Sequence, residues 1–460
     1  LSSLKGEYYT RRLSDLNDIE NRILKHLLGS HGEKLSNLTQ PVIIVAKTLT
    51  PSETAILPQN KTLAFITDTG GRTSHTAIVA RTRGIPAVVG LGDITKQICN
   101  GDTIIVDGQK GTIVINPDMQ SLSNYSETKR IEGIRHANLK SIIHLPTETK
   151  DGYSISLFAN IEEPSEVKGA MENGAMGIGL YWTEFIYVDK QSPTEEEHFQ
   201  AYSSAIKYLK GRSLIIRTLD FGADKDFGLQ DFQGEKNPFL GCRSIRLCFE
   251  KIELFKTQLR AILRASALGK IKIMFPMISS LEELLQAKQI LNQVKEELRR
   301  KKISFNNDIK VGMMIEIPST AMIADLLANE VDFFSIGTND LVQYTLAVDR
   351  INERVAYLYK PAHPAIFRLI QNVVNIANEN RIRVSICGEM SSEFAYLMPL
   401  LGIGLRYFSV SPSIIPECKE FIRRITMRRA MEITNKIMAF KTHYEVIEYL
   451  NKEINKEINF

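Results

Sequence analysis

The stretch "DFFSIGTND", residues 332–340, joins a short apolar run to a polar pair, Asn339 and Asp340. Runs of this kind recur eight times in the second part of the chain, with helical stretches between most of them. The eight runs are SISLFAN (154–160), MGIGLY (176–181), LIIRTLD (214–220), IKIMFPM (271–277), VGMMIEI (311–317), DFFSIGT (332–338), VSICGE (384–389) and YFSV (407–410). Eight strands alternating with helices predict a (β/α)8 barrel, with a doubly wound sheet as the alternative.

Polar residues follow the same end of several of these runs. Arg217 ends the third run, Glu316 the fifth and Cys387 the seventh, while Asn339 and Asp340 follow the sixth. A charged side chain in an apolar strand is costly unless it is paired or faces a site. Any one of these residues could belong to a structural ion pair. Because catalytic groups of such barrels lie at the carboxyl ends of the strands, a shared site is the better interpretation.

The part of the chain before the barrel predicts a small α/β unit and a connecting helix. Apolar runs within 42–117 read as strands, and SHTAIVARTRG (74–84) reads as a helix. Residues 118–143 are polar and charged and predict a helical linker. Residues 9–28 form an amphipathic pattern without a partner before it, which suggests that N-terminal sequence is missing.

Composition excludes several classes of function. The chain has 57 basic and 53 acidic residues, a net charge of +4 that is too even to argue for nucleic acid or an anionic membrane. Its apolar runs are too short to span a bilayer, and no signal-peptide core is present. Five scattered cysteines without metal spacing predict reduced thiols and a cytoplasmic protein.

The segment "GGRTSHTAIVARTRGIPAVVG", residues 70–90, has the pattern of an anion site at a helix start. Gly70 and Gly71 permit close approach of the backbone to a ligand. Ser74 and His75 then stand where free N–H groups favour an anion. A neutral imidazole there can attack phosphorus, and a helix-capping histidine is the alternative.

The full string resembles the phosphohistidine motif of the phosphoenolpyruvate-utilising enzymes. It is closer to Enzyme I of the sugar phosphotransferase system than to pyruvate phosphate dikinase or phosphoenolpyruvate synthase. Further segments share the resemblance, which runs over essentially the whole chain: LTPSETA (49–55), NPFLGCRSIR (237–246), RAILRASALGKIKIMFPMI (260–278), DFFSIGTNDLVQYTLAVDR (332–350) and CGE (387–389). The resemblance implies a phosphotransferase that begins sugar uptake by moving phosphate from phosphoenolpyruvate to the carrier protein HPr.

The resemblance also implies a role for individual residues. His75 is the phosphorylated nucleophile, and Glu316 and Asp340 hold Mg²⁺, a hard cation that keeps water or substrate ligands. Arg217, Asn339, Asp340 and Arg350 bind phosphoenolpyruvate, and Arg243 and Lys225 are further cations that could instead pair with Asp220 or Asp224. Cys387 donates the proton that turns the enolate into pyruvate. On composition alone, Cys387 would read as a core thiol.

The resemblance implies four segments and a homodimer that forms through the barrel. Residues 1–33 resemble the end of a helical HPr-docking subdomain, and 34–117 a phosphohistidine α/β domain. Residues 118–143 would then be the helical linker, and 144–460 the barrel that binds phosphoenolpyruvate. One histidine must visit two sites, so the linker has to be flexible.

The chain departs from the family pattern at one residue, in "GLYWTEF", 179–185. Trp182, the single tryptophan, stands where relatives carry an arginine that contacts the substrate phosphate. A neutral indole with one N–H donor cannot replace a bidentate cation. Two alternatives to an active Enzyme I stay open, and Trp182 favours the first of them. One is an impaired protein that keeps only phosphoenolpyruvate binding or dimer contacts, and the other is a fragment of a dikinase or synthase.

Overall fold

The computed structural model describes residues 38–458 apart from 50–52, 54–56, 59–60, 71–75, 78–79, 81–84, 109, 188–191, 222–236 and 353. The chain divides into two compact units, with the boundary between His136 and Ala137. Each unit has its own strands, and the helix α4 (Met119–Ile142) spans the boundary. This helix occupies the residues for which the polar sequence predicts one.

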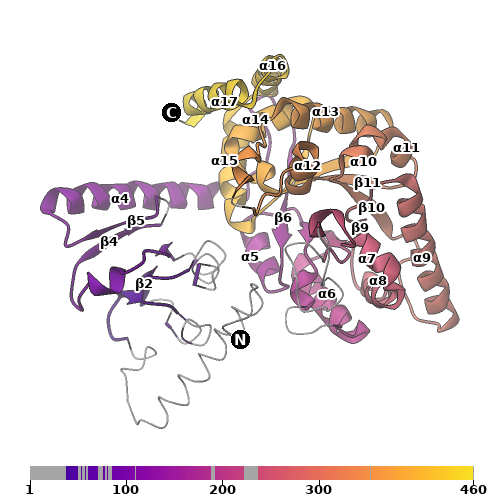
Figure 1. Ribbon diagram of the computed structural model, residues 1–460, viewed down its shortest axis with the longest axis horizontal. Helices are drawn as coiled ribbons and strands as arrows, with labels where there is room; N and C mark the ends of the chain where they lie inside the picture. The colour runs from indigo at the N-terminus through magenta and orange to yellow at the C-terminus, as the bar shows by residue number, and fades with distance from the viewer. Residues whose placement is uncertain are drawn as a thin grey trace, which may run out of the picture. The chain divides into compact units, whose positions relative to one another are not determined.

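The second unit is a closed barrel of parallel strands (Figure 1). Each strand pairs with the next along the chain, and β13 pairs with β6 to close the ring. The strands are β6 (Ser156–Ile161), β7 (Ile178–Tyr181), β8 (Leu214–Arg217), β9 (Ile271–Phe275), β10 (Lys310–Ile315), β11 (Phe333–Gly337), β12 (Arg383–Cys387) and β13 (Tyr407–Val410). Each of the eight predicted runs overlaps one of these strands, with bounds that agree within a few residues. The predicted (β/α)8 barrel is confirmed, and the doubly wound sheet is wrong.

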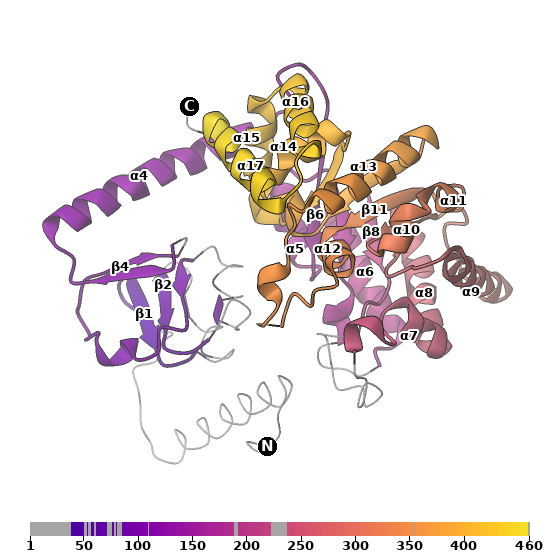
Figure 2. The same ribbon diagram turned by 45° about the horizontal axis from the view of Figure 1, so that its top comes forward.

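Helices surround the barrel, as the two views in Figures 1 and 2 show. They are α5 (Glu166–Glu172), α6 (Glu195–Leu209), α7 (Ile245–Glu250), α8 (Ile252–Ser266), α9 (Leu281–Arg300), α10 (Pro318–Met322), α11 (Ala324–Ala328), α12 (Thr338–Leu346), α13 (Pro364–Glu379), α14 (Phe394–Ile403), α15 (Ile415–Arg424), α16 (Met427–Met438) and α17 (His443–Ile458). Short 3-10 helices cover Ile94–Lys96, Glu184–Tyr187, Pro238–Leu240, Ala356–Leu358, Glu389–Ser392 and Pro412–Ile414.

Local sequence signals explain where the longer helices begin. Thr194 caps the start of helix α6 in a capping box, in which the Thr194 hydroxyl and the Glu197 carboxylate each accept from the other residue's backbone N–H. Ser280 caps the start of helix α9, where its side chain accepts from the Glu283 N–H, and this helix ends in Arg299 and Arg300. Acidic first turns and basic last turns complement the helix dipole.

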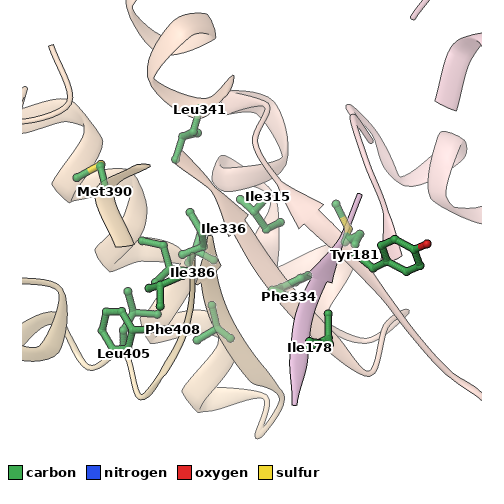
Figure 3. Packing of buried hydrophobic residues seen from close by; sticks show 14 of the residues in the cluster. Ile178, Tyr181, Ile315, Phe334, Ile336, Leu341, Ile386, Met390, Leu405 and Phe408 are labelled. Atoms are coloured by element: carbon green, nitrogen blue, oxygen red, sulfur yellow. The ribbon is translucent and has the colours of Figure 1, made fainter. Parts of the chain in front are cut away.

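The barrel core has two layers, separated by the alternation of side chains along each strand. Outward-facing strand residues pack against the helices, and Figure 3 shows part of this layer, including residues of β7, β10, β11, β12 and β13 and Leu341 of α12. A separate cluster consists of strand residues alone, with Trp182 packed against it. Its buried members are Leu180, Ile215, Met274, Met314, Phe333 and Cys387. They fill the barrel interior, which is therefore a packed core.

The first unit contains two small sheets in its described part. The strands β1 (Val42–Ala46), β2 (Thr62–Thr67) and β3 (Ala87–Val88) form a parallel sheet in that order. The strands β4 (Ile104–Asp107) and β5 (Thr112–Ile115) form an antiparallel hairpin. All five lie within runs that the sequence predicts to be strands.

Among the helices that the structure describes, none combines the length and the apolar character that crossing a membrane requires.

Candidate active site at the barrel mouth

Five of the predicted site residues lie at the carboxyl ends of the barrel strands. Arg217 and Cys387 are the last residues of β8 and β12, and Glu316 directly follows β10. Asn339 and Asp340 lie in the first turn of α12, directly after β11. Because the strands are parallel and form a closed ring, these ends meet at one mouth of the barrel. The site proposed from the sequence is therefore a single place in the fold.

Arg217 is buried between two carboxylates. Its Nη2 pairs with Glu184, and its Nη1 lies 2.9 Å from the Asp220 Oδ2. Burial alone would lower the pKa of Arg217, but Glu184 and Asp220 outweigh that effect and hold the pKa above its ordinary value. The guanidinium therefore stays charged within the protein interior.

Arg243 continues this charged cluster. Its Nη2 lies 3.0 Å from the Asp220 Oδ1, and its Nη1 lies 3.5 Å from the Asp340 Oδ1. The same Nη1 donates to the Tyr344 hydroxyl at 3.1 Å. Glu184, Arg217, Asp220, Arg243 and Asp340 thus form a chain of alternating charges, which we call the charge chain. Each of its side chains is at most 9% exposed, so every charge depends on its neighbours for compensation.

Both arginines keep one buried N–H group that the charge chain does not use. The Nε atoms of Arg217 and Arg243 are buried and make no hydrogen bond with the part of the protein that the structure describes. A guanidinium binds phosphate or carboxylate best through two parallel N–H groups. The cluster therefore retains donor capacity for an anionic ligand, although its Nη groups are already engaged.

Glu316 and Asp340 form the acidic part of the site. The Glu316 Oε1 accepts from the backbone N–H of Met277 at 2.6 Å. Burial, together with the nearby Asp340 and Asp220 carboxylates, raises the pKa of Glu316 to about 8. A cation bound at these carboxylates would relieve that repulsion.

The donor set suits a hard cation that is only partly ligated by protein. Within the described residues, no group of three or more His, Cys, Asp or Glu side chains is arranged to hold a metal ion. Two carboxylates leave positions open for water and for substrate oxygens, which is how Mg²⁺ is usually bound. Glu316 and Asp340 fit such an ion.

Cys387 is a buried thiol near the same charges. Its Sγ lies 3.5 Å from the Ser335 Oγ and donates to the Ile336 carbonyl at 3.5 Å. Burial raises the pKa of Cys387 to about 11, with Ser335 acting in the opposite direction. The side chain is therefore a protonated thiol at neutral pH, which is the state that a proton donor needs.

Asn339 is held by the turn that follows Cys387. Its Oδ1 accepts from the Glu389 N–H at 2.9 Å. Gly388, between Cys387 and Glu389, has a φ of +94°. A Cβ at this position would lie 2.4 Å from the Thr338 Oγ1 and 2.8 Å from the Asn339 Oδ1. Only glycine fits this close approach.

Arg350 lies beyond α12, at the edge of the site. Its backbone N–H donates to the Gln343 Oε1 at 3.2 Å. Burial raises the pKa of the Tyr359 hydroxyl, and the charge of the Arg350 side chain partly offsets this effect. That hydroxyl donates to the Asn339 carbonyl at 3.3 Å. Arg350 is thus connected to the strand-end residues through Tyr359.

Trp182 lies beside the charge chain. The Arg217 Cζ is 5.9 Å from the centre of its indole ring. The half-buried indole packs against the cluster that fills the barrel, and its backbone N–H donates to the Ile161 carbonyl at 2.9 Å. The residue that departs from the family pattern is therefore next to the arginine predicted to bind phosphate.

Two groups predicted from the sequence fall outside the described residues. His75, with Ser74 and Gly71, lies in the stretch 71–75. Lys225 and Asp224 lie in the stretch 222–236. Their roles stay predictions.

Sequence reasoning missed the partners that hold the arginines. The sequence assigns no role to Glu184, although a charged residue shortly after a buried strand is the available signal. It offers Asp220 as a partner of Arg243 but not of Arg217, and Asp220 contacts both. Tyr344 and the Met277 N–H carried no sequence signal, because neither belongs to a charged or strand-end pattern.

Comparison with known proteins places both units in one group. Residues 136–427 match the family model described as PEP-utilising enzyme, PEP-binding domain, and residues 38–111 match PEP-utilising enzyme, mobile domain. The phosphoenolpyruvate-protein phosphotransferase of Bacillus subtilis (strain 168) is 46% identical over 98% of this chain and 79% of that protein. The protein of the same name from Staphylococcus carnosus (strain TM300) is 42% identical over the same shares of both chains.

Solved structures add little to this comparison. An NMR structure titled as Enzyme I is 47% identical, covers 29% of this chain and 53% of that one, and has a TM-score of 0.26. A HpcH/HpaI aldolase/citrate lyase family protein from Burkholderia cenocepacia is 12% identical, covers 65% of this chain and 99% of that one, and has a TM-score of 0.36.

Proposed function

Because the chain belongs to the PEP-utilising enzymes and, among them, to the phosphoenolpyruvate-protein phosphotransferases, we propose that it moves the phosphoryl group of phosphoenolpyruvate to His75 and then to HPr. The observation that carries this proposal is the charge chain at the barrel mouth, with Glu316 and Cys387 within its electrostatic reach. The site holds buried cations for a phosphate, carboxylates for a metal ion and a protonated thiol.

In the proposed transfer, the first unit supplies the nucleophile and the barrel supplies the residues that bind phosphoenolpyruvate. The imidazole of His75 attacks phosphorus, the N–P bond forms, and the bond from phosphorus to the enol oxygen breaks. Arg217 and Arg243 supply positive charge to the transferring phosphoryl oxygens, and Asn339 and Arg350 bind the substrate. The leaving enolate takes the Cys387 proton at carbon and becomes pyruvate.

The proposed metal is Mg²⁺, held by Glu316 and Asp340. When bound, it would neutralise charge on the phosphate and carboxylate of the substrate. The two carboxylates would fix the ion and keep the remaining ligand positions open.

The segment assignments belong to the same proposal. Residues 1–33 would be part of an HPr-docking subdomain, 34–117 the phosphohistidine domain, 118–143 the linker and 144–460 the barrel. A homodimer through the barrel and a cytoplasmic location complete it. No nucleic acid or membrane insertion is involved.

A second candidate is a protein that binds phosphoenolpyruvate but transfers its phosphate poorly. The position of Trp182 beside Arg217 favours it, because an indole occupies space next to the proposed phosphate cation. A dikinase or synthase fragment is the third alternative, and it would pass label to a nucleotide and phosphate.

One labelling experiment separates these candidates. The purified chain is incubated with Mg²⁺ and labelled phosphoenolpyruvate, and acid-labile protein label is measured. We expect label that His75→Ala abolishes and that passes to added HPr. No label at high protein concentration, together with measurable phosphoenolpyruvate binding by calorimetry, would favour the second candidate. Label that passes to a nucleotide and phosphate, and not to HPr, would favour the third.

A further inference from the structure

A buried hydrogen-bond network holds the backbone at the end of β8. It contacts the carbonyl of Arg217 and the N–H of Leu219. The Thr183 Oγ1 donates to the Arg217 carbonyl at 3.1 Å. The Gln258 Nε2 donates to that same Thr183 hydroxyl at 3.0 Å, and the Gln258 Oε1 accepts from the Leu219 N–H at 2.9 Å. A single amide from α8 therefore joins the segment after β7 to the segment after β8.

The network continues away from the site into α6. The Gln258 Nε2 also donates to the Tyr202 hydroxyl at 3.3 Å, and that hydroxyl lies 3.0 Å from the His198 Nδ1. Burial lowers the pKa of His198 to about 4 and raises the pKa of Tyr202. The network is therefore neutral at physiological pH, and its geometry does not depend on a titrating group.

Simple packing does not account for so many polar groups in this place. Thr183, Gln258 and Tyr202 have no exposed surface, and His198 is 1% exposed. Apolar side chains of similar size would pack there without the cost of removing polar groups from water. A fully satisfied buried network instead fixes one geometry. Here the fixed elements are the ends of β7 and β8, which carry Glu184, Arg217 and Asp220 of the charge chain.

The two segments joined by Gln258 carry Glu184 and Arg217, which form an ion pair with each other. Glu184 directly follows Thr183, and Arg217 lies two residues before Leu219. Asp220, which contacts both arginines, directly follows Leu219. A shift of either backbone segment would therefore move a carboxylate relative to the guanidinium that it orients.

We propose that Thr183 and Gln258 are positioning residues for phosphoryl transfer, because they fix the backbone from which Arg217, Glu184 and Asp220 reach the substrate phosphate. This inference rests on the proposed function of the barrel mouth. It assigns no contact with substrate to either residue.

The test uses the full chain and matched variants. Thr183→Val removes the hydroxyl at nearly constant volume, Thr183→Ser retains it, and Gln258→Leu removes the amide. Thr434→Val is the control, because Thr434 is also buried and donates to the Pro399 and Ala430 carbonyls, but it lies in α16. Three quantities are measured: the single-turnover labelling rate, the melting temperature and the emission spectrum of Trp182.

We expect Thr183→Val and Gln258→Leu to slow labelling by roughly 10- to 100-fold, because small displacements of positioned groups cost rates of this order. Thr183→Ser should restore the rate to within about threefold of the wild type. Both slow variants should also shift the Trp182 emission, since Trp182 directly precedes Thr183. Thr434→Val should lower the melting temperature without changing either readout.

Labelling by Thr183→Val and Gln258→Leu at the wild-type rate, with unchanged Trp182 emission, would overturn the inference and leave a structural role only. Failure of the proposed function looks different, because the wild type itself would take no label. In that case the positioning role falls together with the proposed function, whereas a labelled wild type with unimpaired Thr183→Val and Gln258→Leu variants overturns the inference alone.

Discussion

The Arg217 guanidinium carbon lies 5.9 Å from the centre of the Trp182 indole ring. The chain's single tryptophan thus borders a buried arginine whose two Nη groups already pair with Glu184 and Asp220. An anion that binds Arg217 must share it with two carboxylates and with the face of an indole. Trp182 is consequently both a constraint on the site and its natural fluorescent reporter.

Trp182→Arg should raise the rate of labelling from phosphoenolpyruvate. The new guanidinium would lie near Glu184 and Asp220, which can compensate it, and would offer a second fork to the phosphate. One such contact is worth on the order of 10²–10³ in rate. The measurement is the single-turnover formation of acid-labile label.

Trp182→Phe is the control for this prediction, because it makes room without adding charge. We expect it to change the rate by less than about threefold, which is within the range of a small packing effect. An equal gain for Phe and Arg would mean that bulk, and not the missing cation, limits the wild type.

The stability of the Mg²⁺-free barrel should depend on the protonation of Glu316. Its folded pKa of about 8 lies above the ordinary 4.5. Between these values the unfolded chain has lost the proton and the folded chain keeps it. The contribution of Glu316 to the free energy of unfolding is therefore greatest below pH 4.5. It falls as the pH rises to about 8, by up to roughly 1.4 kcal/mol per pH unit.

The check compares melting temperatures of the wild type and Glu316→Gln at pH 5 and pH 8. Without Mg²⁺, the melting temperature of the variant should rise relative to that of the wild type as the pH increases, because the amide does not ionise. Added Mg²⁺ should stabilise the wild type more at pH 8 than at pH 5, since a bound metal requires the ionised carboxylate. A variant that responds to Mg²⁺ like the wild type would show that Glu316 is not a ligand.

Arg243→Met should destabilise the barrel strongly. It removes the cation between Asp220 and Asp340 and leaves two buried carboxylates without it, a change that typically costs about 3–5 kcal/mol. Urea unfolding followed by Trp182 fluorescence measures the loss. Arg428→Met removes an exposed ion pair with Glu432 in the same unit, where the side chains are 88% and 51% exposed, and should cost less than about 1 kcal/mol.

The barrel could be predicted because each strand is a mainly apolar run, as expected for parallel strands covered on both faces. Arg217, Glu316 and Cys387 could be assigned to one site because they end such runs. The compensation of charge could not be predicted in the same way. Glu184 and Arg217 are 33 residues apart, and Arg243 and Asp340 are 97 apart, so their pairing depends on strand order and side-chain direction in three dimensions.

For Trp182, the position at the site could be predicted from the sequence, but its packing could not. Its place in a strand-end motif predicted a position at the site, and the structure puts it next to Arg217. Its packing against the cluster that fills the barrel could not be read from the sequence, because the six buried members of that cluster come from six different strands.

Gly388→Ala should slow phosphoryl transfer without unfolding the barrel. The added Cβ would lie 2.4 Å from the Thr338 Oγ1 and 2.8 Å from the Asn339 Oδ1, so the turn after Cys387 or the start of α12 must move. Asn339 and Asp340 would move with it. Displacements of this size in a positioned site can reduce rates by about 100-fold.

Gly211→Ala separates this effect from backbone strain. Gly211 has a φ of +83°, close to the +94° of Gly388, but its Cβ would meet no atom within 4 Å. Both variants should lose stability, on the order of 1–3 kcal/mol, because both force a side chain into a positive-φ conformation. Only Gly388→Ala should lose the labelling rate. If both variants label at the wild-type rate, the close approach of Gly388 to Asn339 has no part in positioning the site; if both slow equally, the loss comes from strain and not from the contact.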